Sequence, residues 1–157
     1  GLSMSGLSRR FAPPLLAFLE NIGRGKTRAP GTDTQNYVAT APFEGNLLTG
    51  DEAMYRFMYE TLVVNAQLGL AGPTVHWVRQ AMDEMDALHQ ATPPDVPTLI
   101  ALGSEEKIVS QRAIREMSAS WPAANLKTYP GARHEVIMET PALRTRFFDD
   151  CAAHFLA

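Results

Sequence analysis

Two carboxylates and a histidine follow two expected strands in the C-terminal half of the sequence. Glu105 and Glu106 come just after an apolar run that ends in Gly103, and His134 follows a second expected strand that ends in Tyr129. A carboxylate that accepts the Nδ1 proton of a histidine fixes the tautomer of the ring and stabilises the imidazolium that forms when the other nitrogen takes a proton from a nucleophile. These residue types therefore predict the acid and the base of a hydrolytic triad, with either Glu105 or Glu106 as the acid.

The segments around these residues predict two parallel strands joined by a helix. Residues 98–102 (TLIAL) form a continuous apolar run, which is typical of a strand covered on both faces, and residues 125–129 (NLKTY) form the second strand. A helix is expected over about 110–120, and another begins at Thr140-Pro141. Because the carboxyl ends of neighbouring parallel strands meet at one edge of the sheet, about 4.8 Å apart, the carboxylate and the histidine are expected to meet. The predicted fold class is therefore α/β, with a βαβα unit.

The N-terminal part of the sequence predicts helices without strands. These helices are expected to begin at Pro13-Pro14, at the capping-box sequence 49–52 (TGDE) and at Pro73-Thr74, and to end near Gly23, Gln67 and His89. Residues 1–10 and 24–46 are expected to be loops. A Pro-rich break over 91–97 (ATPPDVP) separates the two patterns. We therefore expect a helical cap or lid region over 1–92 and a βαβα part over 93–157.

Composition and charge limit the classes of function. The chain has 157 residues, a net charge of −3 and basic and acidic residues mixed along its length, which gives no indication of nucleic-acid binding. It has no apolar run long enough to span a membrane and no signal-peptide pattern, and its single cysteine, Cys151, suits a reducing compartment. These features favour a cytoplasmic protein with at most peripheral membrane contact. A metal site at His134, Glu135 and Glu139 is not expected, because no second suitably spaced histidine is present.

The strings 103–109 (GSEEKIV) and 130–136 (PGARHEV) resemble the C-terminal end of the α/β-hydrolase superfamily. Within it, the chain most resembles the lysophospholipase L2 and monoacylglycerol lipase-like branch. The resemblance implies that Glu106, three residues past the strand-ending glycine, is the catalytic acid, and that His134 in its G-x-x-H pattern is the base. Residues 41–48 (APFEGNLL) and 71–75 (AGPTV) also resemble the helical cap of this branch. No cofactor is implied.

The sequence departs from the superfamily at the nucleophile. No G-x-S-x-G occurs, and the nearest string, 1–6 (GLSMSG), has Ser5 where the second glycine belongs. The upstream strands, nucleophile elbow and oxyanion hole are therefore expected to be missing. The resemblance implies a serine ester hydrolase acting on a lysophospholipid or a monoacylglycerol in the complete protein. This chain alone is expected to be inactive and to need the N-terminal part of the same hydrolase.

Several alternatives stay open at this point. Epoxide hydrolases and dehalogenases share the acid–histidine ending but use an aspartate nucleophile. A non-catalytic lipid-binding module, or a structural fragment whose sheet edge is filled by the rest of the protein, also fits the sequence. Arg133, beside the histidine, is a candidate contact for a phosphate, and His76 is a candidate lining residue of an acyl pocket, although a surface role fits it better.

Overall fold

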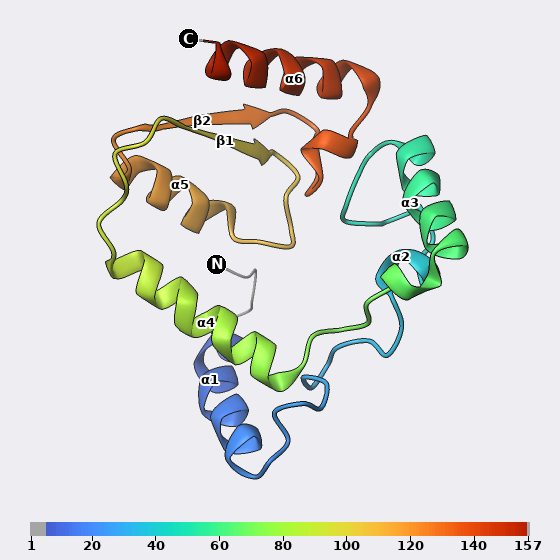
Figure 1. Cartoon of the computed structure of the whole chain (residues 1–157), viewed down its shortest axis with the longest axis vertical. Helices are drawn as coiled ribbons and strands as arrows, with labels where there is room; N and C mark the ends of the chain where they lie inside the picture. The colour runs from blue at the N-terminus through green and yellow to red at the C-terminus, as the bar shows by residue number, and fades with distance from the viewer. Residues whose placement is uncertain (1–5, 157) are drawn as a thin grey trace. The chain divides into compact units, whose positions relative to one another are not determined.

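The computed structural model describes residues 6–156, which form two compact units (Figure 1). The strand unit comprises residues 42–58 and 92–156, and the helical unit comprises residues 6–41 and 59–91. The elements are α1 (Gly6–Asn21), α2 (Tyr37–Thr40), α3 (Glu52–Val64), the 3₁₀ turn η1 (Ala66–Leu68), α4 (Val75–Gln90), β1 (Thr98–Gly103), α5 (Gln111–Ser120), β2 (Ala124–Tyr129), the 3₁₀ turn η2 (Val136–Met138) and α6 (Pro141–Phe155). The division expected from the sequence, 1–92 and 93–157, stays a prediction.

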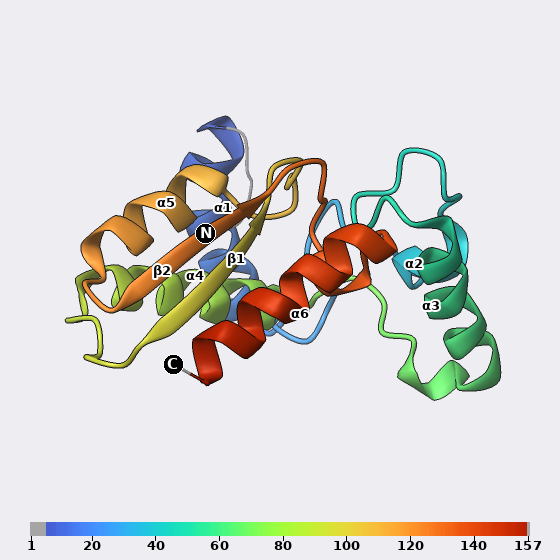
Figure 2. The ribbon, with the colours of Figure 1, turned by 90° about the horizontal axis from the view of Figure 1, so that it is seen from above.

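The strand unit is built on two parallel strands. β1 and β2 pair from Thr98 opposite Ala124 to Gly103 opposite Tyr129, so both strands end at the same edge. Helix α5 covers one face of this pair and α6 covers the other (Figures 1 and 2). Tyr129, Ala132 and Val136 are buried and form the core with apolar side chains from β1 and α6. The βαβα unit expected from the sequence is confirmed.

The two helices that cover the strands, α5 and α6, begin where the sequence indicates. The Ser110 side chain accepts a hydrogen bond from the Ala113 N–H and caps α5, and Pro141 occupies the first turn of α6. On α6, Leu143 and Phe147 pack against the core, but Phe155 at its end is 79% exposed. Leu143 and Phe147 are therefore partly buried against the sheet, whereas Phe155 in the last turn is exposed.

Helix α3 begins two residues later than its sequence suggests. The Asp51 side chain accepts hydrogen bonds from the Ala53 and Met54 N–H groups, which makes Asp51, rather than Thr49, the residue that caps the helix. The Thr49 hydroxyl instead donates to the Met138 carbonyl at 2.7 Å. The helix also ends at Val64 rather than near Gln67, and the 3₁₀ turn η1 follows it. The Thr49 oxygen accepts the Asp51 N–H at 2.9 Å, one residue before the helix begins, so the capping-box prediction placed the helix start too early.

In the helical unit, α1 packs against α4 around Leu16, Ala29 and Val75, with Val78 and Met82 beside them. The start of α4 agrees with the sequence, because the Thr74 side chain accepts the Trp77 N–H. Helix α1, however, begins at Gly6 and runs through both prolines, so the loop prediction for 6–10 was wrong. A proline inside a helix removes an N–H donor and crowds the carbonyl four residues earlier, so local propensity disfavours this continuation. Packing supports it, because Ala12 before the prolines and Leu16 after them both contribute to the core of this unit. The loop expected over 1–5 lies outside the described residues.

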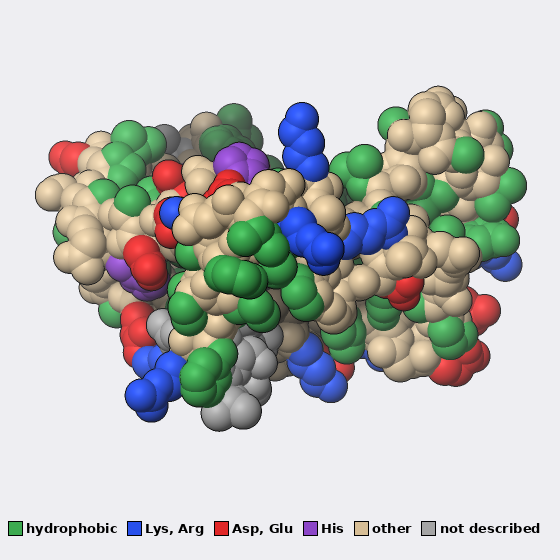
Figure 3. All heavy atoms as spheres, turned by 90° about the horizontal axis from the view of Figure 1, so that it is seen from below, with side chains coloured by type: hydrophobic (Ala, Val, Ile, Leu, Met, Phe, Trp, Pro, Cys, Tyr) green, Lys and Arg blue, Asp and Glu red, His purple; other side chains and the backbone are tan. Residues whose placement is uncertain are grey.

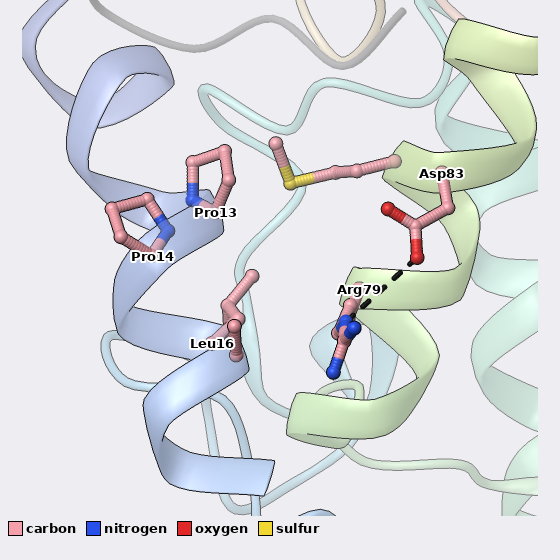
Figure 4. A pocket seen from close by; sticks show the side chains of 7 residues that line it. Pro13, Pro14, Leu16, Arg79 and Asp83 are labelled. Atoms are coloured by element: carbon pink, nitrogen blue, oxygen red, sulfur yellow. Dashed lines mark ion pairs between the residues drawn. The ribbon is translucent and has the colours of Figure 1, made fainter. Parts of the chain in front are cut away.

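A surface pocket of about 300 Å³ lies between these two helices (Figure 4). Pro13, Pro14 and Leu16 of α1 line it together with Arg79 and Asp83 of α4, and the last two form an ion pair at 3.8 Å. No helix within residues 6–156 is long and apolar enough to cross a membrane. On the face drawn in Figure 3, basic and acidic side chains are interspersed with apolar ones. This agrees with the mixed charge pattern of the sequence.

Candidate active site

Glu106 and His134 lie in direct contact just past the ends of the two strands. The His134 Nδ1 atom is 2.5 Å from Oε2 of Glu106, and the Glu106 residue is only 7% exposed. The carboxylate comes from the loop after β1 and the histidine from the loop after β2, so the parallel pairing of the strands brings them together. The exposed residue Glu105 makes no described contact with the histidine ring. Of the two carboxylates, Glu106 is therefore the one that contacts His134.

The second oxygen of the Glu106 carboxylate is held by the backbone. Oε1 accepts hydrogen bonds from the Ile108 N–H at 2.5 Å and from the Val109 N–H at 3.0 Å. The Gln111 side chain, at the first turn of α5, donates to the Glu106 carbonyl oxygen at 3.0 Å. The carboxylate is thus fixed in orientation, with Oε1 facing the backbone and Oε2 facing His134.

The pKa of the Glu106 carboxyl lies below its ordinary value. Burial by itself raises this pKa, because it disfavours the charged form. The hydrogen bonds from the Val109 N–H, the His134 ring and the Ile108 N–H all stabilise the carboxylate, and together they outweigh the burial. The acid of the pair is therefore held ionised at neutral pH, which is the state that orients a histidine.

This lowered pKa predicts a pH-dependent contribution to stability. Glu106→Gln is expected to reduce the free energy of unfolding at neutral pH, and the difference from the wild type is expected to shrink in acid. A group whose pKa is lowered in the folded state stabilises the fold above its unfolded-state pKa, ordinarily 4.5, and loses that contribution as the pH falls through the folded-state value. Urea unfolding from about pH 7 to about pH 3 measures the difference.

The control for this measurement is Glu105→Gln, which neutralises the exposed neighbouring carboxylate. It is expected to show little difference from the wild type at any pH. A Glu106→Gln difference that stays constant from neutral to acidic pH would contradict the assigned direction of the pKa.

The loop that carries His134 is supported by the end of β1. The Glu105 N–H donates to the Ala132 carbonyl at 2.9 Å, and the Ser104 hydroxyl accepts the Gly131 N–H at 2.8 Å. Gly103 lies directly beneath this loop, where a Cβ atom would stand 2.1 Å from the Arg133 carbonyl oxygen. Only glycine permits so close an approach of the two backbones. The strand-ending glycine of the sequence pattern is therefore a packing requirement of the histidine loop.

A second support for His134 comes from residues 46–50, which we call the seat loop. The His134 N–H donates to the Leu47 carbonyl at 3.3 Å, and the Glu135 N–H donates to the Leu48 carbonyl at 2.8 Å. The side chain of Asn46, 3% exposed, shapes the loop by accepting the Leu48 and Thr49 N–H groups. The sequence reading assigned this segment to the cap and missed its contact with the histidine. An asparagine followed by apolar residues is too common a pattern to reveal it.

The remaining candidates lie elsewhere or have other partners. Arg133 donates from Nη1 to the carbonyls of the seat loop, so its contact with a phosphate stays a prediction. His76 pairs with Glu20 in the helical unit, and the same Glu20 carboxylate also binds Arg79. Cys151 lines a shallow pocket of about 270 Å³ beside β1. Within residues 6–156 no cluster of histidine, cysteine, aspartate and glutamate is suited to hold a metal ion.

Comparison with known proteins identifies the family. Residues 34–141, more than half of the chain, match the family described as "Serine aminopeptidase, S33", also called Hydrolase_4. The chain belongs to this hydrolase family. The matched region includes both Glu106 and His134, together with the seat loop and both strands.

Its relatives include lysophospholipases. The chain is 29% identical over 117 residues to a probable lysophospholipase L2 of Haemophilus influenzae, covering 74% of this chain and 37% of that protein. It is 27% identical over 132 residues to the lysophospholipase L2 of Escherichia coli K12, covering 79% of this chain and 36% of that protein. The chain thus spans little more than a third of the length of these curated relatives.

A solved structure shows the same fold. A soluble variant of monoglyceride lipase from Saccharomyces cerevisiae, crystallised with a substrate analog, aligns with a TM-score of 0.65 and 20% sequence identity. The alignment covers 95% of this chain and 48% of the lipase chain. The fold class expected from the sequence, part of an α/β-hydrolase, is confirmed. Within that superfamily, the chain is similar to lysophospholipases and to a monoglyceride lipase.

Proposed function

We propose that Glu106 and His134 are the acid and the base of a Ser-His-acid triad in a carboxylic ester hydrolase. The observation that carries this proposal is the 2.5 Å contact between His134 Nδ1 and Glu106 Oε2 at the ends of two parallel strands. Within residues 6–156 no hydrogen bond to His134 Nε2 is present, so this nitrogen is available to a nucleophile from outside the strand unit. A serine contributed by an upstream segment of the same hydrolase supplies that nucleophile.

Each residue then has a defined step. His134 Nε2 takes the proton of the serine hydroxyl as the serine oxygen attacks the ester carbonyl. Glu106 keeps the proton of the ring on Nδ1 and stabilises the imidazolium. The imidazolium gives its proton to the leaving alkoxide, and in the second half of the reaction His134 activates water in the same way. The backbone N–H groups that bind the oxyanion come with the upstream segment.

The proposed substrate is a lysophospholipid or a monoacylglycerol. Support comes from the names of the relatives, which are lysophospholipases and a monoglyceride lipase. Both substrates present one fatty acyl ester on a glycerol, so the same chemistry serves both. Comparing kcat/KM of the full-length hydrolase for a lysophospholipid, a monoacylglycerol, an aminoacyl anilide and an alkyl epoxide tests this assignment. Preference for the anilide or the epoxide would refute the lipid ester proposal.

The 157-residue chain alone is expected to have no triad-dependent activity, because it contains no G-x-S-x-G nucleophile. Removing the nucleophile of a triad hydrolase lowers kcat by about 10⁶-fold. Hydrolysis of a short-chain nitrophenyl ester, followed in the chain and in its His134→Ala variant, provides the measurement. Both are expected to give the same background rate.

Ser3 and Ser5 lie in the nearest nucleophile-like string and outside the described residues. A double Ser3→Ala, Ser5→Ala variant is therefore the matched control for this experiment. Turnover that depends on His134 and survives both serine substitutions would show that the nucleophile has been wrongly assigned. Turnover that is lost with Ser3 or Ser5 would place the nucleophile within the chain.

A further inference from the structure

A second glutamate, Glu139, is buried beside the candidate site without touching the reacting atoms. Its residue is 1% exposed and stands at the end of η2. Oε1 accepts two backbone hydrogen bonds, from the Arg133 N–H at 2.8 Å and from the Gly50 N–H at 3.0 Å. Oε2 accepts the Thr140 N–H at 3.3 Å. One oxygen of the carboxylate therefore binds both the backbone N–H of Arg133, the residue before His134, and the backbone N–H of Gly50, the last residue of the seat loop.

Further hydrogen bonds join the same two segments. The Arg133 guanidinium donates from Nη1 to the Asn46 carbonyl at 3.0 Å and to the Thr49 carbonyl at 2.8 Å. The Thr49 hydroxyl donates to the Met138 carbonyl at 2.7 Å. With the His134, Glu135 and Gly50 N–H groups described above, six hydrogen bonds connect the seat loop to residues 133–139. The backbone before and after His134 is thus hydrogen-bonded to the seat loop.

The contacts of Glu139 fit a structural acceptor of backbone N–H groups better than a catalytic acid or a metal ligand. The His134 Nδ1 atom is already bound to Glu106, and both oxygens of Glu139 face backbone N–H groups. A buried carboxyl is costly unless its oxygens are bound, and here they are bound to three separate backbone donors. A Cβ added to Gly50 would stand only 3.1 Å from Oε2, so the seat loop approaches the carboxylate closely because it has a glycine there.

We propose that Glu139 is a positioning residue for His134, holding the Arg133 N–H and the seat loop so that the ring stays aligned between Glu106 and the nucleophile. This inference rests on the proposed function, since it assigns His134 as the base. Displacing a catalytic group by about 1 Å lowers the rate by about 10²-fold. Loss of the Glu139 acceptor therefore lowers kcat while the binding of the substrate, measured by KM, stays nearly unchanged.

The test compares two variants of the full-length hydrolase that differ in one acceptor atom. Glu139→Met keeps the length of the side chain but leaves the Arg133 and Gly50 N–H groups without a partner. Glu139→Gln keeps one oxygen, and that oxygen can accept both donors. We expect Glu139→Met to lower kcat by about 10²-fold with KM changed less than about threefold, and Glu139→Gln to recover most of the loss. Glu116→Met, on the exposed face of α5, is the control for the substitution itself and keeps the wild-type kcat.

A second readout separates positioning from plain stability. The Nδ1–H proton of His134 gives a downfield NMR signal when Glu106 holds it, and in folded Glu139→Met this signal shifts or broadens. If Glu139→Met does not fold, Arg133→Met releases the seat loop from the other side and is expected to lower kcat about tenfold or more in the same way.

The outcomes distinguish a failure of the positioning role from a failure of the proposed function. Full activity and an unchanged Nδ1–H signal in folded Glu139→Met, or in folded Arg133→Met where the first variant does not fold, would overturn the positioning role alone. Full activity in His134→Ala would instead overturn the proposed function on which that role rests.

Discussion

Replacing His134 by alanine in the full-length hydrolase is expected to lower kcat by about 10⁶-fold with a lysophospholipid or monoacylglycerol substrate. The imidazole carries the proton in both halves of the proposed reaction, so its loss leaves the serine as a neutral and weak nucleophile. His134 is partly buried in the strand unit, and its backbone N–H donates to the Leu47 carbonyl. Because this hydrogen bond does not involve the side chain, removing the imidazole is expected to leave the loop in place. Substrate binding, read from KM, is expected to change little.

Steady-state hydrolysis and labelling by a serine-directed fluorophosphonate measure this effect independently. The His134→Ala protein is expected to lose both, because the probe also needs an activated serine. His154→Ala is the matched control, since it removes another histidine of the strand unit on the far end of α6 and is expected to keep kcat within about twofold of the wild type. A His134→Ala enzyme that retains more than about a hundredth of the wild-type kcat would exclude a triad base at this position.

The strand unit was largely predictable because its signals are local. An apolar run, a glycine and a pair of carboxylates predict the end of β1, and Ser110 and Pro141 mark the starts of the two helices that cover the sheet. Parallel pairing then brings the strand ends together without further information, since the crossover helix between them permits it. A contact between His134 and one of the two carboxylates follows from these local patterns and one rule of sheet topology, and the family resemblance indicated Glu106.

The support around His134 was not predictable because it depends on pairs far apart in the chain. The hydrogen bonds from Thr49 to Met138 and from Gly50 to Glu139 each join residues 89 positions apart. The local pattern at Thr49 is that of a helix cap, and no neighbouring residue indicates that its hydroxyl has another partner. The burial of Glu139 was equally hard to predict, since an isolated glutamate before Thr-Pro is typical of a solvated side chain. Its burial becomes visible only once the seat loop is in place.

The helical unit was harder to predict for a different reason. Proline is typical of the first turn of a helix, so Pro13 and Pro14 indicated a start that the chain does not use. Their rings instead line the pocket between α1 and α4, where they contribute apolar surface. The hydrogen bonds that tie Glu20 to His76 and Arg79 cross more than fifty residues and have no sequence pattern of their own. The presence of helices in this unit could therefore be predicted from the sequence, whereas the ends of the helices and their polar contacts could not.

Replacing Glu106 by glutamine is expected to lower kcat by about 10⁴-fold, a smaller loss than that of the histidine. The structure explains how so conservative a change has so large an effect. The Ile108 and Val109 N–H groups both donate to one oxygen of the side chain, so the amide oxygen of glutamine must take that place. The amide NH₂ then faces the Nδ1 atom of His134.

This orientation imposes the wrong tautomer on the histidine. An NH₂ group only donates, so Nδ1 must accept and the ring proton moves to Nε2, the nitrogen that has to take the proton of the serine. The base is thereby blocked although the geometry is kept. Substrate binding does not involve this contact, so KM is expected to stay within about threefold of the wild type.

Glu105→Gln makes the same chemical change one residue earlier, on an exposed side chain, and is expected to leave kcat unchanged. Glu106→Asp tests the charge and the length of the side chain separately, because it keeps the carboxylate on a side chain shorter by one methylene. It is expected to be more active than Glu106→Gln and less active than the wild type. Equal losses in Glu105→Gln and Glu106→Gln, or a full loss in Glu105→Gln alone, would move the acid of the triad to the neighbouring position. Nitrogen-15 NMR of the histidine ring reports the tautomer directly, and Nδ1 protonation in folded Glu106→Gln would refute the explanation even where kcat falls as expected.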